Sequence, residues 1–136
     1  MRIITSLVIM SFLLLLSCGK IEKNEYTDVI IRNLDAMNSE NLQAAMATIH
    51  EDSQLYDNTE TMTEALFEAY DISYKLVSCK VVDKSPSEVS VEAKQITKKI
   101  SGPEFINNMT VIRHVLRQSN GMWKIYESKI EDMRKI

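Results

Sequence analysis

The feature that most constrains the fold is a change in the spacing of apolar residues near Ile72. Before this point, apolar side chains recur every three or four residues, whereas after it they alternate with polar ones for most of the remaining chain. The first spacing is typical of amphipathic helices and the second of strands with one buried face. The sequence therefore predicts helices followed by strands, which is the order of an α+β domain.

The N-terminal half predicts three helices. They cover Glu25–Met37, Leu42–Ile49 and a third segment that ends at Tyr70. A short polar turn separates the first two, and either Thr61 or Thr63 is suited to cap the third.

The C-terminal half predicts four long strands joined by hairpins. The strands cover residues 72–84, 88–99, 108–118 and 122–133, and the Asn120-Gly121 pair before the last one is a strong hairpin signal. Strands of ten or more residues exceed the usual length unless they bend. We therefore expect a strongly curved four-stranded antiparallel sheet in which the three helices pack, a cone-shaped α+β barrel.

The alternation also assigns residues to strand faces. In the first strand, Ile72, Tyr74 and Leu76 share one face, and strict alternation places Cys79 and Val81 on the other. The second strand carries Val89, Val91, Ala93, Gln95 and Thr97 on one face. His114 shares a face of the third strand with Ile112 and Leu116. The pattern alone leaves open which face of that strand is turned toward the helices.

The first residues resemble an export signal. One basic residue, Arg2, precedes an apolar run from Ile3 to Leu16, and a polar segment follows at once. The run is shorter than the ~20 residues that a spanning helix needs. A short basic start, a brief apolar segment and small residues at its end are typical of a secretory signal.

Leu15-Leu16-Ser17-Cys18 resembles the lipobox of bacterial lipoproteins. The resemblance implies cleavage before Cys18, lipid attachment to its thiol and acylation of the new amino terminus. Residues 1–17 would then be a signal peptide, and residues 18–24 the lipidated cysteine with a short tether. The protein would lie in the bacterial cell envelope, anchored to a membrane and facing the exported side. A plain secretory signal is the alternative.

Removing residues 1–17 leaves 119 of the 136 residues, enough for one domain over residues 25–136. Arg2 is the one charged residue lost, so the formal net charge changes from −3 to −4, which argues against a nucleic-acid partner. With Cys18 lipidated, Cys79 is left alone, and its apolar strand predicts burial. The sequence predicts no metal site and no cofactor, because it lacks a CxxC pair, a histidine cluster and a glycine-rich phosphate loop.

Two segments resemble the nuclear transport factor 2-like superfamily, which includes SnoaL-like and ketosteroid-isomerase-like domains. They are "LDAMNSENLQAAMATIHEDSQLY" (Leu34–Tyr56) and the closing strand over Gly121–Ile130. The resemblance implies a cone of helices and curved sheet around a pocket, and dimers through the sheet face are common among these relatives. It implies no particular reaction.

Enzymes of this superfamily use polar residues inside the cone. The residues to weigh for catalysis here are His50, Asp52, Tyr56 and His114. They would serve a small isomerase or hydro-lyase, which is the alternative hypothesis. His50 and Asp52 end a predicted helix, where a histidine favours the helix C-terminus and an acid serves the turn.

The preferred hypothesis is a noncatalytic domain that binds a small apolar ligand or an envelope protein. Tyr74, Gln95 and His114 are the residues expected to supply polar contacts, provided that their faces are turned into the cone. Trp123 is expected to pack against the helices. The methionines of the domain are expected to fill the core rather than line a pocket.

Overall fold

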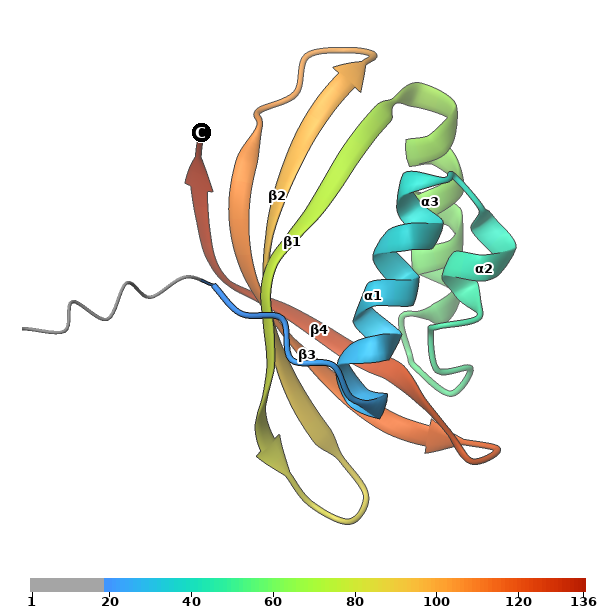
Figure 1. Cartoon of the computed structure of the whole chain (residues 1–136). Helices are drawn as coiled ribbons and strands as arrows, with labels where there is room; N and C mark the ends of the chain where they lie inside the picture. The colour runs from blue at the N-terminus through green and yellow to red at the C-terminus, as the bar shows by residue number, and fades with distance from the viewer. Residues whose placement is uncertain (1–18) are drawn as a thin grey trace, which may run out of the picture.

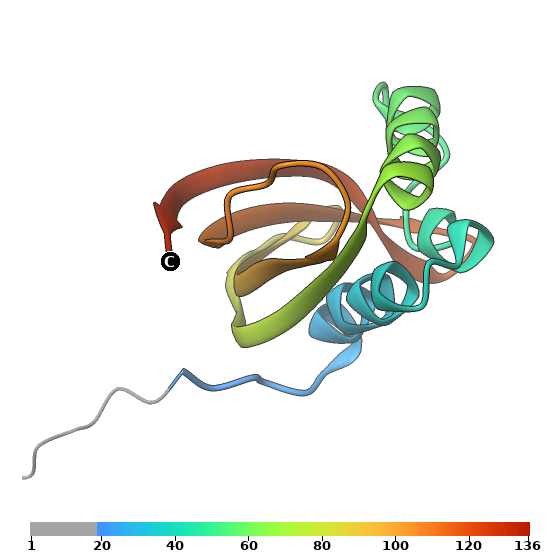
Figure 2. The same ribbon diagram turned by 90° about the horizontal axis from the view of Figure 1, so that it is seen from above.

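The computed structural model describes residues 19–136, so the predicted signal peptide and Cys18 lie outside the described residues. Three helices precede a four-stranded antiparallel sheet whose strand order is β1-β2-β3-β4 (Figure 1). The elements are α1 (Glu25–Asn38), α2 (Leu42–Met46), α3 (Tyr56–Ala69), β1 (Asp71–Lys84), β2 (Val89–Ser101), β3 (Asn108–Ser119) and β4 (Met122–Lys135). The sheet curls strongly, with the helices gathered on one side of it (Figure 2). The predicted α+β class and curved sheet are confirmed.

Asparagine side chains begin the first two helices. Asn24 accepts hydrogen bonds from the N–H groups of Tyr26 and Thr27, and the Thr27 hydroxyl oxygen accepts one from the Asn24 N–H, which completes a capping box. Asn41 caps α2 through the Ala44 N–H. The helix ends at Met46 rather than at Ile49 as predicted, because Ile49 forms a bridge with Ile125 of β4.

The predicted start of the third helix is wrong. Helix α3 begins at Tyr56, and Leu55 at its N-cap offers no side-chain hydrogen bond. Thr61 lies inside the helix, where its hydroxyl donates to the Asp57 carbonyl at 3.0 Å. Thr63 is buried inside the same helix. Both threonines therefore lie inside the helix rather than at its N-cap. A threonine hydroxyl can bond the backbone in either position, so the sequence alone does not distinguish the two.

A bulge in β1 corrects the expected face of Cys79 and Val81. Leu76 pairs with Gln95, but the next pair is Ser78 with Lys94, so β1 carries one extra residue at this point. The extra residue shifts the alternation, and Cys79 and Val81 therefore join Tyr74 and Leu76 in packing against the core. Strict alternation placed them on the opposite face.

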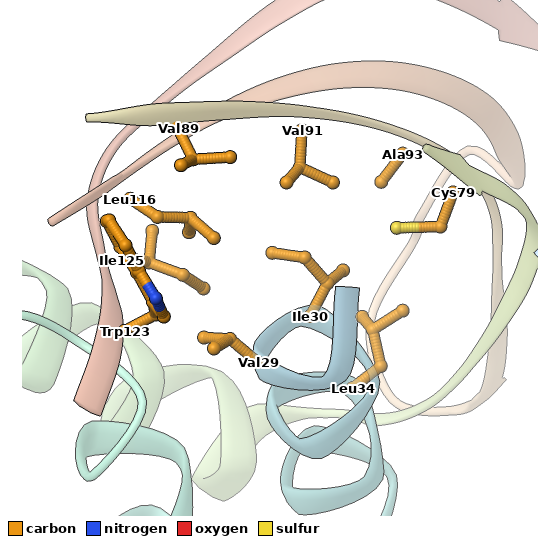
Figure 3. Packing of buried hydrophobic residues seen from close by; sticks show 10 residues of the cluster. All are labelled: Val29, Ile30, Leu34, Cys79, Val89, Val91, Ala93, Leu116, Trp123 and Ile125. Carbon is orange, nitrogen blue, oxygen red and sulfur yellow. The ribbon is translucent and has the colours of Figure 1, made fainter. Parts of the chain in front are cut away.

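The core lies between α1 and the concave face of the sheet (Figure 3). Val29, Ile30 and Leu34 project from α1 toward buried residues of all four strands, namely Cys79, Val89, Val91, Ala93, Leu116, Trp123 and Ile125. The Trp123 ring meets Tyr26 of α1 edge to face, with ring centroids 5.2 Å apart. The prediction that Trp123 packs against the helices is confirmed.

The segment before α1 is fixed to the sheet rather than free. The Cys79 N–H donates to the Lys20 carbonyl at 3.1 Å, and the Glu22 N–H donates to the Cys79 carbonyl at 2.9 Å. Ile21 between them packs against the core. Part of the expected tether thus forms a short parallel pairing with β1. Within residues 19–136, no helix has the length and apolar character needed to cross a bilayer.

Candidate functional site

A cavity of about 420 Å³ lies between the helices and the concave face of the sheet. All three helices and all four strands contribute to its wall. The apolar part of the wall includes Leu34, Met37, Met46, Ile49, Ile112 and Ile125. Tyr74, Gln95 and His114, the three residues expected to supply polar contacts, all line this same cavity.

The strand register explains why these side chains meet. Gln95 lies between Leu76 of β1 and Thr110 of β3, and His114 lies opposite Val91 of β2. Residues opposite one another in an antiparallel sheet share a face. The face of β3 that carries His114 is therefore the concave one, which the sequence pattern had left open. Gln95 and His114 are each 8% exposed.

His114 has one satisfied and one unsatisfied ring nitrogen. Its Nδ1 lies 2.7 Å from the Ser128 hydroxyl oxygen. Its Nε2 is buried and finds no hydrogen-bond partner among the described residues. Burial disfavours the charged imidazolium and lowers the pKa of His114 from 6.5 to about 4. The ring is therefore neutral near pH 7.

Tyr74 is held by the end of α1. The Tyr74 N–H donates to Asn38 Oδ1 at 2.8 Å, and Asn38 Nδ2 donates to the Tyr74 carbonyl at 2.9 Å. These bonds place the Tyr74 backbone next to the cavity. Burial raises the pKa of the Tyr74 phenol above 10.0, so the hydroxyl remains protonated and can donate or accept a hydrogen bond.

His50 has a structural role outside the cavity. Its Nδ1 accepts a hydrogen bond from the Asp52 N–H at 3.1 Å, so the ring proton lies on Nε2 and is donated to the Gln118 carbonyl, also at 3.1 Å. Asp52 is exposed, and Tyr56 lies at the first turn of α3. Of the four candidate catalytic residues, His114 alone is part of the cavity wall.

The sequence pattern misplaced Met62 and did not indicate several polar lining residues. Met37, Met46 and Met62 line the cavity. Met46 is also a buried core residue, 6% exposed, as expected, whereas Met62 is 63% exposed, so core filling is the wrong interpretation for Met62. Ser128, Asn33 and Asn58 also line it. The register partner of His114 could have indicated Ser128, but a register shift between Val115 and Leu116 in the pairing with β4 obscures that register in the sequence.

The described residues offer no metal centre. Within residues 19–136 there is no group of three or more histidine, cysteine, aspartate or glutamate side chains that could hold an ion. The one carboxylate of the cavity wall, Glu127, is exposed. The site is thus a mostly apolar cavity with a neutral histidine, an amide and a phenol.

This architecture is that of the nuclear transport factor 2-like proteins. An NTF2-like protein of unknown function from Shewanella oneidensis matches with a TM-score of 0.60 and 14% identity, over 79% of this chain and 97% of that chain. A proposed aromatic ring hydroxylase from Novosphingobium aromaticivorans matches with a TM-score of 0.69 and 13% identity, over 82% of this chain and 91% of that one. At such low identity, the likeness shows the shared fold.

The family is more specific than the fold. The family model of the anti-sigma-I factor RsgI9 C-terminal domain matches residues 28–136, and the chain belongs to this family. Anti-sigma-I factor RsgI9 of Acetivibrio thermocellus is 29% identical over 106 residues, which is 77% of this chain and 15% of that protein. The chain thus spans about 15% of the length of this relative. The sequence motifs had indicated the superfamily but not this family.

Proposed function

We propose that this protein is a lipid-anchored component of the bacterial envelope whose cavity binds a small, mostly apolar ligand without converting it. The observation that carries the proposal is the buried Nε2 atom of His114, which has no hydrogen-bond partner among residues 19–136. The anchor is proposed from the lipobox that ends at Cys18.

An unpaired buried polar atom costs folding free energy, roughly 1–3 kcal/mol. A ligand that places a hydrogen-bonding group against His114 Nε2 would remove this cost. The apolar wall would bury the rest of the ligand, and Tyr74 and Gln95 would orient it from the neighbouring strands. The three methionines of the wall would adapt to its shape.

Catalysis has less support from the same residues. A general base works best when its pKa lies near the working pH, whereas that of His114 is about 4. Its ring contacts a hydroxyl, that of Ser128, rather than a carboxylate that could hold an imidazolium. A small isomerase or hydro-lyase that uses His50, Asp52 or Tyr56 would need these side chains in the cavity wall.

The family relationship supports a binding role. The matched relative is named as an anti-sigma factor, and the shared part is 15% of its length. A regulator can use such a domain to recognise a ligand or a protein partner without chemistry. The binding hypothesis therefore has an alternative in which the cavity mouth binds a protein partner instead of a small ligand.

Native mass spectrometry of the protein purified from its source would reveal a retained ligand. Binding of the amphipathic dye anilinonaphthalene sulfonate should weaken about tenfold in His114→Ala, since the loss of one hydrogen bond in the cavity wall is worth about that factor. Asp52→Ala is the matched control, because Asp52 is exposed outside the cavity. Equal dye affinity in His114→Ala, or substrate turnover that either variant abolishes, would contradict the proposal.

The anchor has its own test. Cys18→Ser should abolish labelling by a palmitate analogue, whereas Cys79→Ala, which removes a buried thiol, should label like the parent chain. Undiminished labelling of Cys18→Ser would show that the lipobox interpretation is wrong.

A further inference from the structure

Residues 19–22 are fixed to the edge of β1 by backbone contacts. Lys20 and Glu22 both pair with Cys79, and the Glu22 carbonyl accepts a hydrogen bond from the Thr27 hydroxyl at 2.6 Å. Gly19 lies so close to β1 that a Cβ atom there would be 2.9 Å from the Val77 carbonyl oxygen. Cys18 is the next residue, and consecutive Cα atoms are about 3.8 Å apart. Little free chain therefore separates Cys18 from the sheet.

We propose that the lipid on Cys18 holds the β1 edge of the sheet directly against an anionic bilayer, so that the cavity mouth faces away from the membrane. The inference rests on the proposed lipid anchor and adds an orientation to it. A lipoprotein on a long tether would instead rotate freely above the surface.

The side chains near this edge suit a phospholipid surface. Lys75 and Lys80 alternate with core-facing residues of β1, so they point to the outer side of the sheet, and both are exposed. Exposed Lys20 lies on the paired segment, where Glu22 is the neighbouring acid. Val82, further along β1, is 40% exposed. Lysines beside an apolar residue are attracted to anionic headgroups at close range.

The cavity mouth lies on the other side of the molecule. β1 and β4 are opposite edges of the sheet, and Tyr126, Glu127 and Ser128 of β4 line the cavity. Leu55 and Met62, two lining residues before and within α3, are more than half exposed and mark the opening. In both views the N-terminal segment reaches the sheet from the side opposite α3 (Figures 1 and 2). A ligand would therefore enter from the aqueous phase rather than from the bilayer.

Lipid-based quenching would test the orientation. The full lipidated chain is placed in vesicles of phosphatidylethanolamine and phosphatidylglycerol that contain a lipid spin-labelled at its headgroup. A fluorophore is attached through Lys80→Cys at the β1 edge or through Glu60→Cys on α3, both at exposed positions. We expect at least threefold stronger quenching at position 80 than at position 60. A ten-residue Gly/Ser insertion between Cys18 and Gly19 should abolish this difference.

Flotation of the same vesicles separates the two proposals. Chains that fail to float overturn the anchor, and the orientation with it. Chains that float but show equal quenching at both positions, or stronger quenching at position 60, overturn the orientation alone. A quenching difference that persists after the Gly/Ser insertion also overturns the claim that the short connection sets the orientation.

Discussion

His114 on β3 and Ser128 on β4 are direct partners across the sheet, and the ring Nδ1 of the first lies 2.7 Å from the hydroxyl of the second. The contact fixes the orientation of the imidazole. The other ring nitrogen remains buried in the cavity wall with no partner in residues 19–136. The strand register therefore places His114 where it can bind a ligand and where its burial makes the stability of the fold depend on pH.

The low pKa of His114 predicts a loss of stability in mild acid. The unfolded chain binds a proton at His114 near pH 6.5, whereas the folded chain binds it near pH 4. Between these values the unfolded state binds more protons, so the free energy of unfolding falls as the pH falls. The stabilising contribution is fully present above pH 6.5 and is lost as the pH approaches 4.

Urea denaturation at pH 7 and pH 4.5 measures this contribution. His114→Gln keeps a polar side chain that does not titrate, so it should lose about 2 kcal/mol less stability than the parent chain over this interval. An NMR titration should show a neutral His114 ring down to about pH 5. Equal acid sensitivity of the two chains would mean that His114 is not buried in the folded state.

The sequence predicts which residues of β2 and β3 share a face, because alternation is regular there, but it does not predict which face of β3 is concave. The sequence therefore groups Gln95 with His114 only on the condition that both faces are turned into the cone. The face of Cys79 could not be predicted from strict alternation, because the bulge after Leu76 adds one residue to β1 and shifts the alternation. The start of α3 was missed for a related reason, since its N-cap residue Leu55 carries no capping group.

Two neighbouring residues at the start of β4 differ in burial, and replacing each one tests whether β4 closes the core. Trp123 is 9% exposed and stacks edge to face on Tyr26, whereas Met122 is 51% exposed. Trp123→Ala should lower the free energy of unfolding by ~3–5 kcal/mol, because it empties a large buried site. Met122→Ala is the control and should change it by less than ~0.5 kcal/mol.

Denaturant titrations of both variants provide the measurement. A loss below about 1 kcal/mol in Trp123→Ala would indicate that the ring is not packed against α1. In that case the start of β4 would not close the core over α1.

The last prediction concerns the reactivity of Cys79. Its side chain is fully buried, and desolvation, with a smaller effect from the charge of Glu22, raises the pKa of the thiol from 9.0 to about 12. Only the thiolate reacts with disulfide reagents such as dithionitrobenzoate, and burial also blocks access. In Cys18→Ser, where Cys79 is the single cysteine, the native chain should react at least a thousandfold more slowly at pH 8 than the urea-unfolded chain.

Lys80→Cys in the same background provides the matched comparison, since position 80 is next along β1 and exposed. Its thiol should react within seconds while Cys79 remains protected, and the reaction should therefore stop at one equivalent. Rapid reaction of both thiols would mean that the pairing of Lys20 and Glu22 with Cys79 opens readily. That result would also weaken the inferred orientation on the membrane, because the orientation depends on this pairing to hold the chain at the β1 edge.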